Sequence, residues 1–135
     1  MPLVENDLFY AYLREGAKHS EIAGQILRKI SEGKIKDVYS STLCLIELAL
    51  LYKTIGEEGR LTPDLAKLTS MEGIRWMALS AKEILVASEL RRELNLGFWD
   101  SHYAAVALLN DKTVISFDEV YDRVPGLKRL DPYKL

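Results

Sequence analysis

Short apolar strand patterns alternate with helical patterns along the whole chain, and this alternation constrains the fold more than any other feature. The strand patterns are rich in β-branched and aromatic residues, and between them apolar residues recur at three- and four-residue intervals, as in helices. Strands that are separated by helices usually pair in parallel. We therefore predict an α/β fold with a central parallel sheet of four to five short strands, flanked by helices on both faces.

The predicted elements can be placed by residue number. We expect Ser80 with Glu83 to form a capping box, Thr62 to cap a helix with Pro63 at its first position, and Asp100 to open an apolar helix. The helix over residues 42–52 is apolar on nearly every side, so we expect it to be buried. Strands are expected at 3–4, 38–40, 73–80, 113–117 and 127–130, and helices at 8–14, 19–30, 42–52, 62–71, 80–94 and 98–110.

Composition limits the class of protein. The chain has 135 residues, of which 48% are hydrophobic and 28% charged, so we expect one domain over residues 1–135. No apolar run approaches the roughly 18 residues that cross a bilayer, and the first residues lack the basic character of a secretory signal. These features predict a cytoplasmic protein without a membrane partner. The single cysteine, Cys44, lies in an apolar stretch and is expected to pack as a small hydrophobe.

The formal net charge of −2 gives no global basic field, which disfavours a simple DNA-binding domain. It does not disfavour an enzyme that acts on nucleic acid, because such an enzyme can gather acids at a metal site. Glycine-rich phosphate loops and a serine nucleophile elbow are missing from the sequence, and the two histidines do not combine with Cys44 in a zinc-type spacing.

Several carboxylates stand in apolar surroundings. Glu47 is the only charged residue of the 42–52 helix, and a buried carboxylate needs a partner such as an arginine, a small water pocket or a metal. Asp118 directly follows the strand at 113–117, where it could serve either as a turn residue or as a ligand. Asp100 has a helix cap as its simplest alternative role, and Glu5 with Asp7 could form a solvated acidic turn.

These carboxylates are expected at one edge of the sheet, because the carboxyl ends of parallel strands and the starts of the adjoining helices meet there. A cluster of acids would repel itself unless a hard cation neutralised it. Mg²⁺ and Mn²⁺ prefer oxygen ligands, keep several waters and bind through one or two carboxylates together with substrate phosphate. That chemistry suits hydrolysis of a phosphodiester bond.

The order of elements and acids resembles that of the PIN domain, a small metal-dependent ribonuclease fold that includes the VapC-type toxins. The resemblance covers nearly the whole chain. Its first motif, an acid followed by polar and then apolar residues, is matched by residues 4–9, and the second, a hydroxyl residue followed by a glutamate in an apolar helix, by Thr42 and Glu47. The third matches Asp100 in an alanine-rich helix, and the fourth matches Ser116 and Asp118 after a strand.

The first motif departs from the family pattern. Glu5 stands where the family usually has aspartate, and Asp7 stands where asparagine or serine is more frequent. By resemblance, Asp100 and an acid from Glu5 or Asp7 would bind the metal directly. Glu47 and Asp118 would help to hold the metal, its waters or a second ion, and the metal and catalytic set would thus be Glu5, Asp7, Glu47, Asp100 and Asp118.

The resemblance implies a Mg²⁺- or Mn²⁺-dependent endoribonuclease, the toxin of a toxin–antitoxin pair, with RNA as substrate. It also implies an antitoxin protein that lies across the acidic groove, and a homodimer. The alternative is a catalytically degenerate PIN-like module that binds RNA or a protein partner. A third possibility is a phosphoryl-transfer domain such as a receiver, but the strand at residues 3–4 is too short to suit it.

Overall fold

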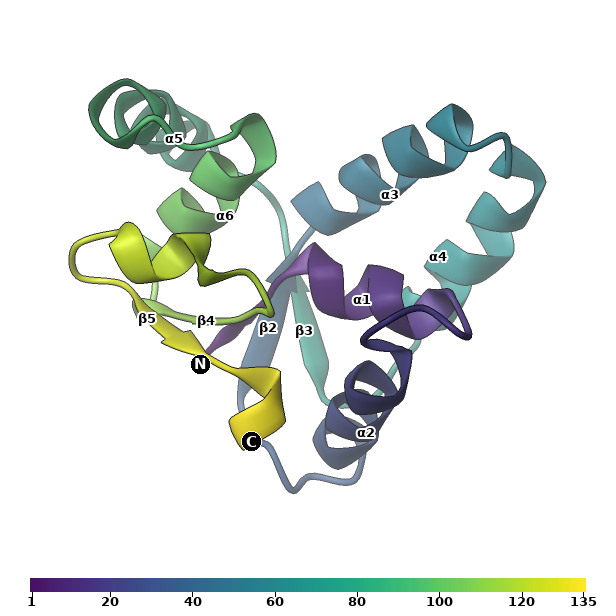
Figure 1. The fold of residues 1–135 in the computed structure, drawn as a ribbon. Helices are drawn as coiled ribbons and strands as arrows, with labels where there is room; N and C mark the ends of the chain where they lie inside the picture. The colour runs from purple at the N-terminus through teal and green to yellow at the C-terminus, as the bar shows by residue number, and fades with distance from the viewer.

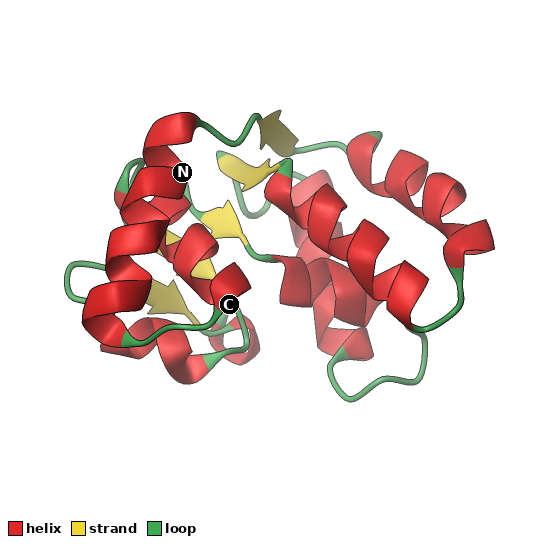
Figure 2. Cartoon of the chain, turned by 90° about the horizontal axis from the view of Figure 1, so that it is seen from above, coloured by secondary structure: helices red, strands yellow, loops and turns green.

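The computed structural model describes all 135 residues and contains one parallel sheet with the strand order β3-β2-β1-β4-β5. Helices lie on both sides of the strands, α1 to α4 on one side and α5 with α6 on the other (Figures 1 and 2). The predicted α/β architecture is therefore confirmed. The strands are β1 (Leu3–Val4), β2 (Val38–Ser41), β3 (Ile74–Met77), β4 (Thr113–Ile115) and β5 (Lys128–Leu130).

Six α-helices connect the strands, and three 3₁₀ turns complete the chain. None of the helices is both long and apolar enough to cross a membrane. The helices are α1 (Asn6–Leu13), α2 (Ser20–Ser31), α3 (Leu43–Thr54), α4 (Leu61–Thr69), α5 (Ala81–Leu94) and α6 (Phe98–Leu108), and the turns are η1 (Glu58–Arg60), η2 (Glu119–Arg123) and η3 (Pro132–Lys134).

The core lies between the sheet and the helices and includes the central strand β1 and the strands on either side of it, β2 and β4. Leu3 and Val4 of β1 and Val114 and Ile115 of β4 are completely buried, as expected for parallel strands covered on both faces. Cys44 is also fully buried, and burial raises the pKa of its thiol to about 12, so the predicted packing role is confirmed. Because β1 is central and only two residues long, Glu5 and α1 begin in the middle of the molecule.

Helix starts differ from the predictions in three places, and the first is α1, which begins at Asn6 and not at residue 8. The capping box of Ser80 and Glu83 is present at α5 as predicted, but Thr62 does not cap α4. The η1 turn runs directly into α4, which therefore begins at Leu61 and places Thr62 and Pro63 inside its first turn. Asp100 is likewise not a cap, because α6 begins two residues earlier, after Gly97.

The prediction that the apolar helix α3 is buried on nearly every side was wrong. One side of α3 packs into the core through Cys44, Leu48 and Tyr52. On another side, Ile46 and Leu50 are 57% and 50% exposed. An all-apolar sequence shows only that a helix avoids water, and it does not show whether the chain itself or a second molecule covers each side.

Candidate active site

Glu5 lies at the carboxyl end of β1 and forms the N-cap of α1. Its Oε1 accepts a hydrogen bond from the backbone N–H of Asp7 at 3.1 Å, and only 6% of the residue is exposed. Glutamate is an unusual cap, since the shorter Asp, Asn, Ser and Thr side chains are preferred there. The solvated acidic turn that the sequence allowed at this position is therefore excluded for Glu5.

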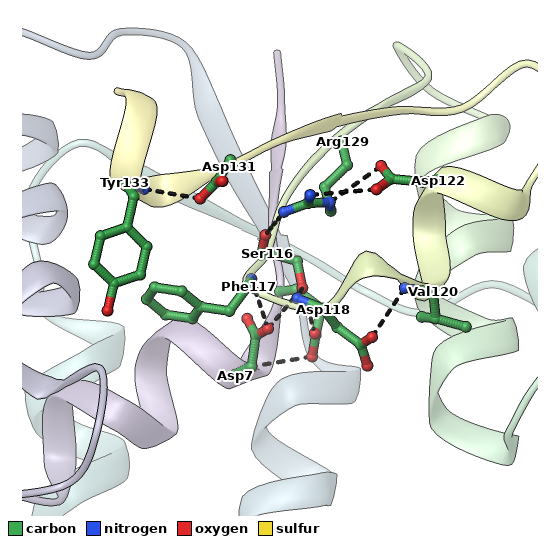
Figure 3. Close-up of polar contacts among 10 residues, drawn as sticks. Asp7, Ser116, Phe117, Asp118, Val120, Asp122, Arg129, Asp131 and Tyr133 are labelled. Carbon is green, nitrogen blue, oxygen red and sulfur yellow. Dashed lines mark hydrogen bonds and ion pairs between the residues drawn. The ribbon is translucent and has the colours of Figure 1, made fainter.

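Ser116, directly after β4, joins Glu5 to Asp7, and Figure 3 shows its contact with Asp7. Its Oγ lies 2.6 Å from Asp7 Oδ2 and 3.1 Å from Glu5 Oε2, and it accepts the N–H of Asp118 at 3.0 Å. A hydroxyl has only one proton to donate, and the nearer acceptor is Asp7. Glu5 Oε2, at 3.1 Å, is the alternative acceptor for the same hydroxyl proton.

Asp7 makes two hydrogen bonds through one carboxylate oxygen, and the neighbouring side chain of Glu5 also lowers its pKa by hydrogen bonding. Oδ2 accepts from Ser116 and from the backbone N–H of Phe117 at 2.9 Å, whereas the buried Oδ1 has no hydrogen-bond partner. Buried polar atoms are nearly always paired, so an unpaired carboxylate oxygen indicates a place for a cation or water.

Glu47 extends from α3 and is held by a tyrosine. The phenol of Tyr103, on α6, donates to Glu47 Oε1 at 2.6 Å, and the side chain of Asn6 forms a further hydrogen bond that lowers the pKa of Glu47. Asn6 is 2% exposed and its own Oδ1 is unpaired. No arginine pairs with Glu47, so the predicted alternative of a buried Glu–Arg pair is excluded.

Asp100 stands in the first turn of α6, where its carboxylate is not needed as a cap. A Cβ atom added to Gly97 would lie 3.3 Å from Asp100 Oδ2, so the absence of a side chain at Gly97 leaves room for this carboxylate. Tyr121 lies near Asp100 and lowers its pKa, while the buried phenol oxygen of Tyr121 has no hydrogen-bond partner in the structure.

Asp118 serves as a turn residue, which is the structural alternative that its position in the sequence allowed. Its Oδ1 accepts from the N–H of Val120 at 2.9 Å and so caps η2, and the residue is exposed. Its charge still reaches the other acids, since it raises the pKa values of both Asp7 and Asp100. Asp118 therefore belongs to the electrostatic cluster while it caps η2 at the exposed surface.

Burial raises the pKa values of the four other carboxyl groups, and repulsion between neighbours adds to it. The pKa of Asp7 rises to about 6, and that of Glu5 rises well above its ordinary value, because of burial and then because of Asp7 and Glu47. Burial raises the pKa of Glu47, with a smaller contribution from Asp100. Each of the five acids repels at least one of the others. The predicted set is therefore gathered at one edge of the sheet.

The five acids surround a region without closing on one point. No three acidic, histidine or cysteine side chains lie at the mutual spacing of a complete metal site. The residues nevertheless suit a hard cation that keeps most of its waters, because such an ion needs few direct carboxylates. The unpaired oxygens of Asn6 and Asp7 and the raised pKa values are the observations that support this fit.

Comparison with protein-family models matched residues 6–127 to the PIN domain. The chain is a PIN domain. The match spans most of the chain and includes four of the five acids, all except Glu5. The resemblance seen in the sequence is therefore confirmed. A comparison with curated proteins found no match.

Solved PIN structures share the fold at low sequence identity. VapBC2 from Rickettsia felis, bound to a DNA fragment from its promoter, has a TM-score of 0.74 and 20% identity, with 95% of this chain and 96% of that chain covered. FitAcB from Neisseria gonorrhoeae has a TM-score of 0.74 and 20% identity over 100% of both chains. VapC20 from Mycobacterium tuberculosis, a sarcin-ricin loop cleaving toxin, has a TM-score of 0.72 and 18% identity, with coverages of 88% and 91%.

Sequence reasoning missed the groups that hold the acids in place. Tyr103 is three residues after Asp100 and Asn6 lies between Glu5 and Asp7, yet a tyrosine in an apolar helix and an asparagine in a turn are unremarkable in sequence. Arg129, which the sequence offered only as a weak candidate for phosphate contact, pairs with Asp122 at 3.1 Å and donates to the carbonyl of Ser116 at 3.1 Å (Figure 3). It thereby supports the loop that carries Ser116.

Proposed function

We propose that this PIN domain is a Mg²⁺- or Mn²⁺-dependent endoribonuclease and the toxin of a VapC-type toxin–antitoxin pair. The observation that carries the proposal is the set of five mutually repelling carboxylates at the carboxyl edge of the central strands, four of which have raised pKa values. A protein gains nothing in stability from such a cluster. It is consistent with a site that binds a cation together with a phosphate group.

The residues that would hold the cation are Asp100 and an acid of the first motif, with Glu47 and Asp118 nearby. When bound, a divalent cation lowers the pKa of its water, orients the phosphate and neutralises the charge that develops on the leaving oxygen. Tyr103 fixes the carboxylate of Glu47, and Ser116 fixes that of Asp7. These two hydroxyl groups limit the movement of the acids while they carry charge.

The proposed antitoxin partner rests on the relatives of the fold. Two further structural neighbours are a toxin–antitoxin complex from Klebsiella pneumoniae and a DNA-bound VapBC from Salmonella typhimurium, at 19% and 16% identity. We propose the same kind of partner for this chain, and a cytoplasmic location in which it would meet both RNA and antitoxin.

A homodimer is proposed because large apolar side chains stay exposed on helices near the site. They lie on α3, α5 and α6, and the most exposed of them is Leu85, at 68%. The exposed large apolar residues on these helices are Ile46, Leu50, Ile84, Leu85 and Phe98. A protein interface would cover such exposed apolar side chains.

The direct test is cleavage of a labelled single-stranded RNA panel by purified protein in Mn²⁺, in Mg²⁺ and in chelator, beside Asp100→Asn. We expect metal-dependent cutting that Asp100→Asn lowers by at least about 100-fold, since removal of one charged group from a catalytic site typically costs that much. Equal trace activity in both proteins would reject the nuclease. It would favour the alternative of a PIN module that only binds RNA or a protein.

A further inference from the structure

Glu5 has both carboxylate oxygens engaged within the protein. Oε1 caps α1 through the N–H of Asp7, and Oε2 contacts the hydroxyl of Ser116 at 3.1 Å. With only 6% of its surface exposed, the side chain is held inside the protein and neither of its oxygens is without a protein contact.

Asp7 shows the opposite arrangement. Its Oδ2 is fixed by two donors, Ser116 and the N–H of Phe117, which hold the carboxylate plane in place. Its Oδ1 is buried and unpaired. An anchored carboxylate with one free oxygen can bind a cation without losing any protein contact, and so needs no rearrangement.

Asn6 supplies an independent observation at the same helix start. It is 2% exposed, its side chain lies against Glu47, and its Oδ1 has no partner. Two consecutive residues, Asn6 and Asp7, thus each carry a buried oxygen that no protein donor satisfies, whereas no oxygen of Glu5 is left unpaired. Hard cations take such amide and carboxylate oxygens as ligands.

We propose that Asp7, and not Glu5, supplies the first-motif carboxylate that binds the divalent cation, and that Glu5 is a positioning residue that caps α1. The ligand has thereby moved two residues along the chain, from the strand end to the first turn of α1. The inference rests on the proposed cation-dependent function, but it concerns which side chain binds and can be tested by binding alone.

The experiment is a Mn²⁺ titration of the full chain, followed by the electron paramagnetic resonance of free Mn²⁺, for wild type, Asp7→Asn, Glu5→Gln and Glu5→Ser. We expect Asp7→Asn to weaken Mn²⁺ binding at least tenfold. Both Glu5 variants should bind within about threefold of wild type, and Glu5→Ser keeps a side chain well suited to an N-cap should glutamine unfold the helix start. Thermal melts in chelator verify that each variant is folded.

Either of two results would overturn the assignment: a tenfold loss in the Glu5 variants with Asp7→Asn unchanged, or no Mn²⁺ binding by wild type. RNA cleavage measured on the same samples separates this inference from the ribonuclease itself. If Mn²⁺ binding depends on Asp7 but no RNA is cleaved, the assignment of Asp7 as the cation ligand is kept and the ribonuclease is rejected. Cleavage by wild type with Mn²⁺ binding unaffected by Asp7→Asn would retain the ribonuclease and reject the ligand.

Discussion

Individual carboxylates in this protein differ by their hydrogen bonds more than by their residue type. Asp100 was expected to be a cap and is not, whereas Asp118 serves as one. The difference arises because α6 begins at Phe98, ahead of Asp100, and η2 begins immediately after Asp118. A shift of a few residues in a helix start therefore decides whether an acid is used for structure or left free for a ligand.

The raised pKa of Asp7 makes the stability of the cation-free protein depend on pH. The carboxyl group has a pKa of about 6 when folded and an ordinary value of 3.8, so the folded state holds its proton more tightly. The contribution of this group to the free energy of unfolding is fully present below pH 4. It is lost as the pH rises through 6, and the loss is at most about 3 kcal/mol. We expect Asp7→Asn to be more stable than wild type at pH 8 in chelator and closer to it at pH 4.5.

The measurement is urea denaturation of both proteins at several pH values in chelator. Subtracting one curve from the other removes the contribution of the acids that do not interact with Asp7, and the difference reports Asp7 together with Glu5, whose pKa Asp7 raises. A stability difference between the two proteins that does not change with pH would contradict the assigned pKa shift of Asp7.

Tyr103 is expected to matter for the site as well as for the fold. Tyr103→Phe removes the 2.6 Å hydrogen bond that lowers the pKa of Glu47, so Glu47 should titrate at higher pH. We expect a stability loss of about 1–2 kcal/mol and Mn²⁺ binding that requires a higher pH. Tyr52→Phe is the control, because it removes an equally short bond, to Asp64, outside the five-acid cluster. An equal shift of Mn²⁺ binding in both variants would reject the role of Tyr103.

At the scale of elements, the turn before β3 is the tightest junction in the fold. Gly73 has a φ of +86°, and a Cβ atom there would lie 2.5 Å from the carbonyl oxygen of Ile30 in α2. Backbone atoms cannot yield to such a contact as a flexible side chain would. The glycine therefore allows α2 to pack closely against the strand entry.

Gly73→Ala should destabilise the protein by more than about 2 kcal/mol, because alanine is strained at this positive φ and its Cβ atom would clash with α2. Gly33→Ala is the matched control, because Gly33 also has positive φ, +76°, but open space around its Cβ position. We expect it to lose only about 1 kcal/mol. Chemical denaturation of both variants checks the difference, and equal losses would show that packing against Ile30 does not matter.

At the scale of the whole molecule, exposed apolar residues predict self-association. If α3 and α5 form the proposed homodimer interface, Leu50→Glu and Leu85→Glu should each raise the dimer dissociation constant at least tenfold, because a buried unpaired charge is costly. Size-exclusion chromatography with light scattering across a dilution series measures this. Glu89→Gln, an uncharged change on the exposed surface of α5, is the control. A wild-type protein that stays monomeric at high concentration would reject the homodimer.

The sequence by itself determined the architecture. The spacing of apolar residues separated strands from helices, because each spacing reflects the burial of one face of the element. The parallel arrangement followed because helices connect successive strands. The edge at which the acids gather followed from the same topology, since strand ends and helix starts meet there. The capping box of Ser80 and Glu83 was also readable, because it depends only on residues three apart.

Only the tertiary structure decided what each acid does. The acids bond to residues from distant segments of the chain. Ser116 is more than a hundred residues from Asp7, and Tyr103 is 56 residues from Glu47. No local pattern encodes a hydrogen bond between such segments. The exposed side of α3 has the same physical origin, because burial depends on which surfaces meet in space and not on the polarity of one segment.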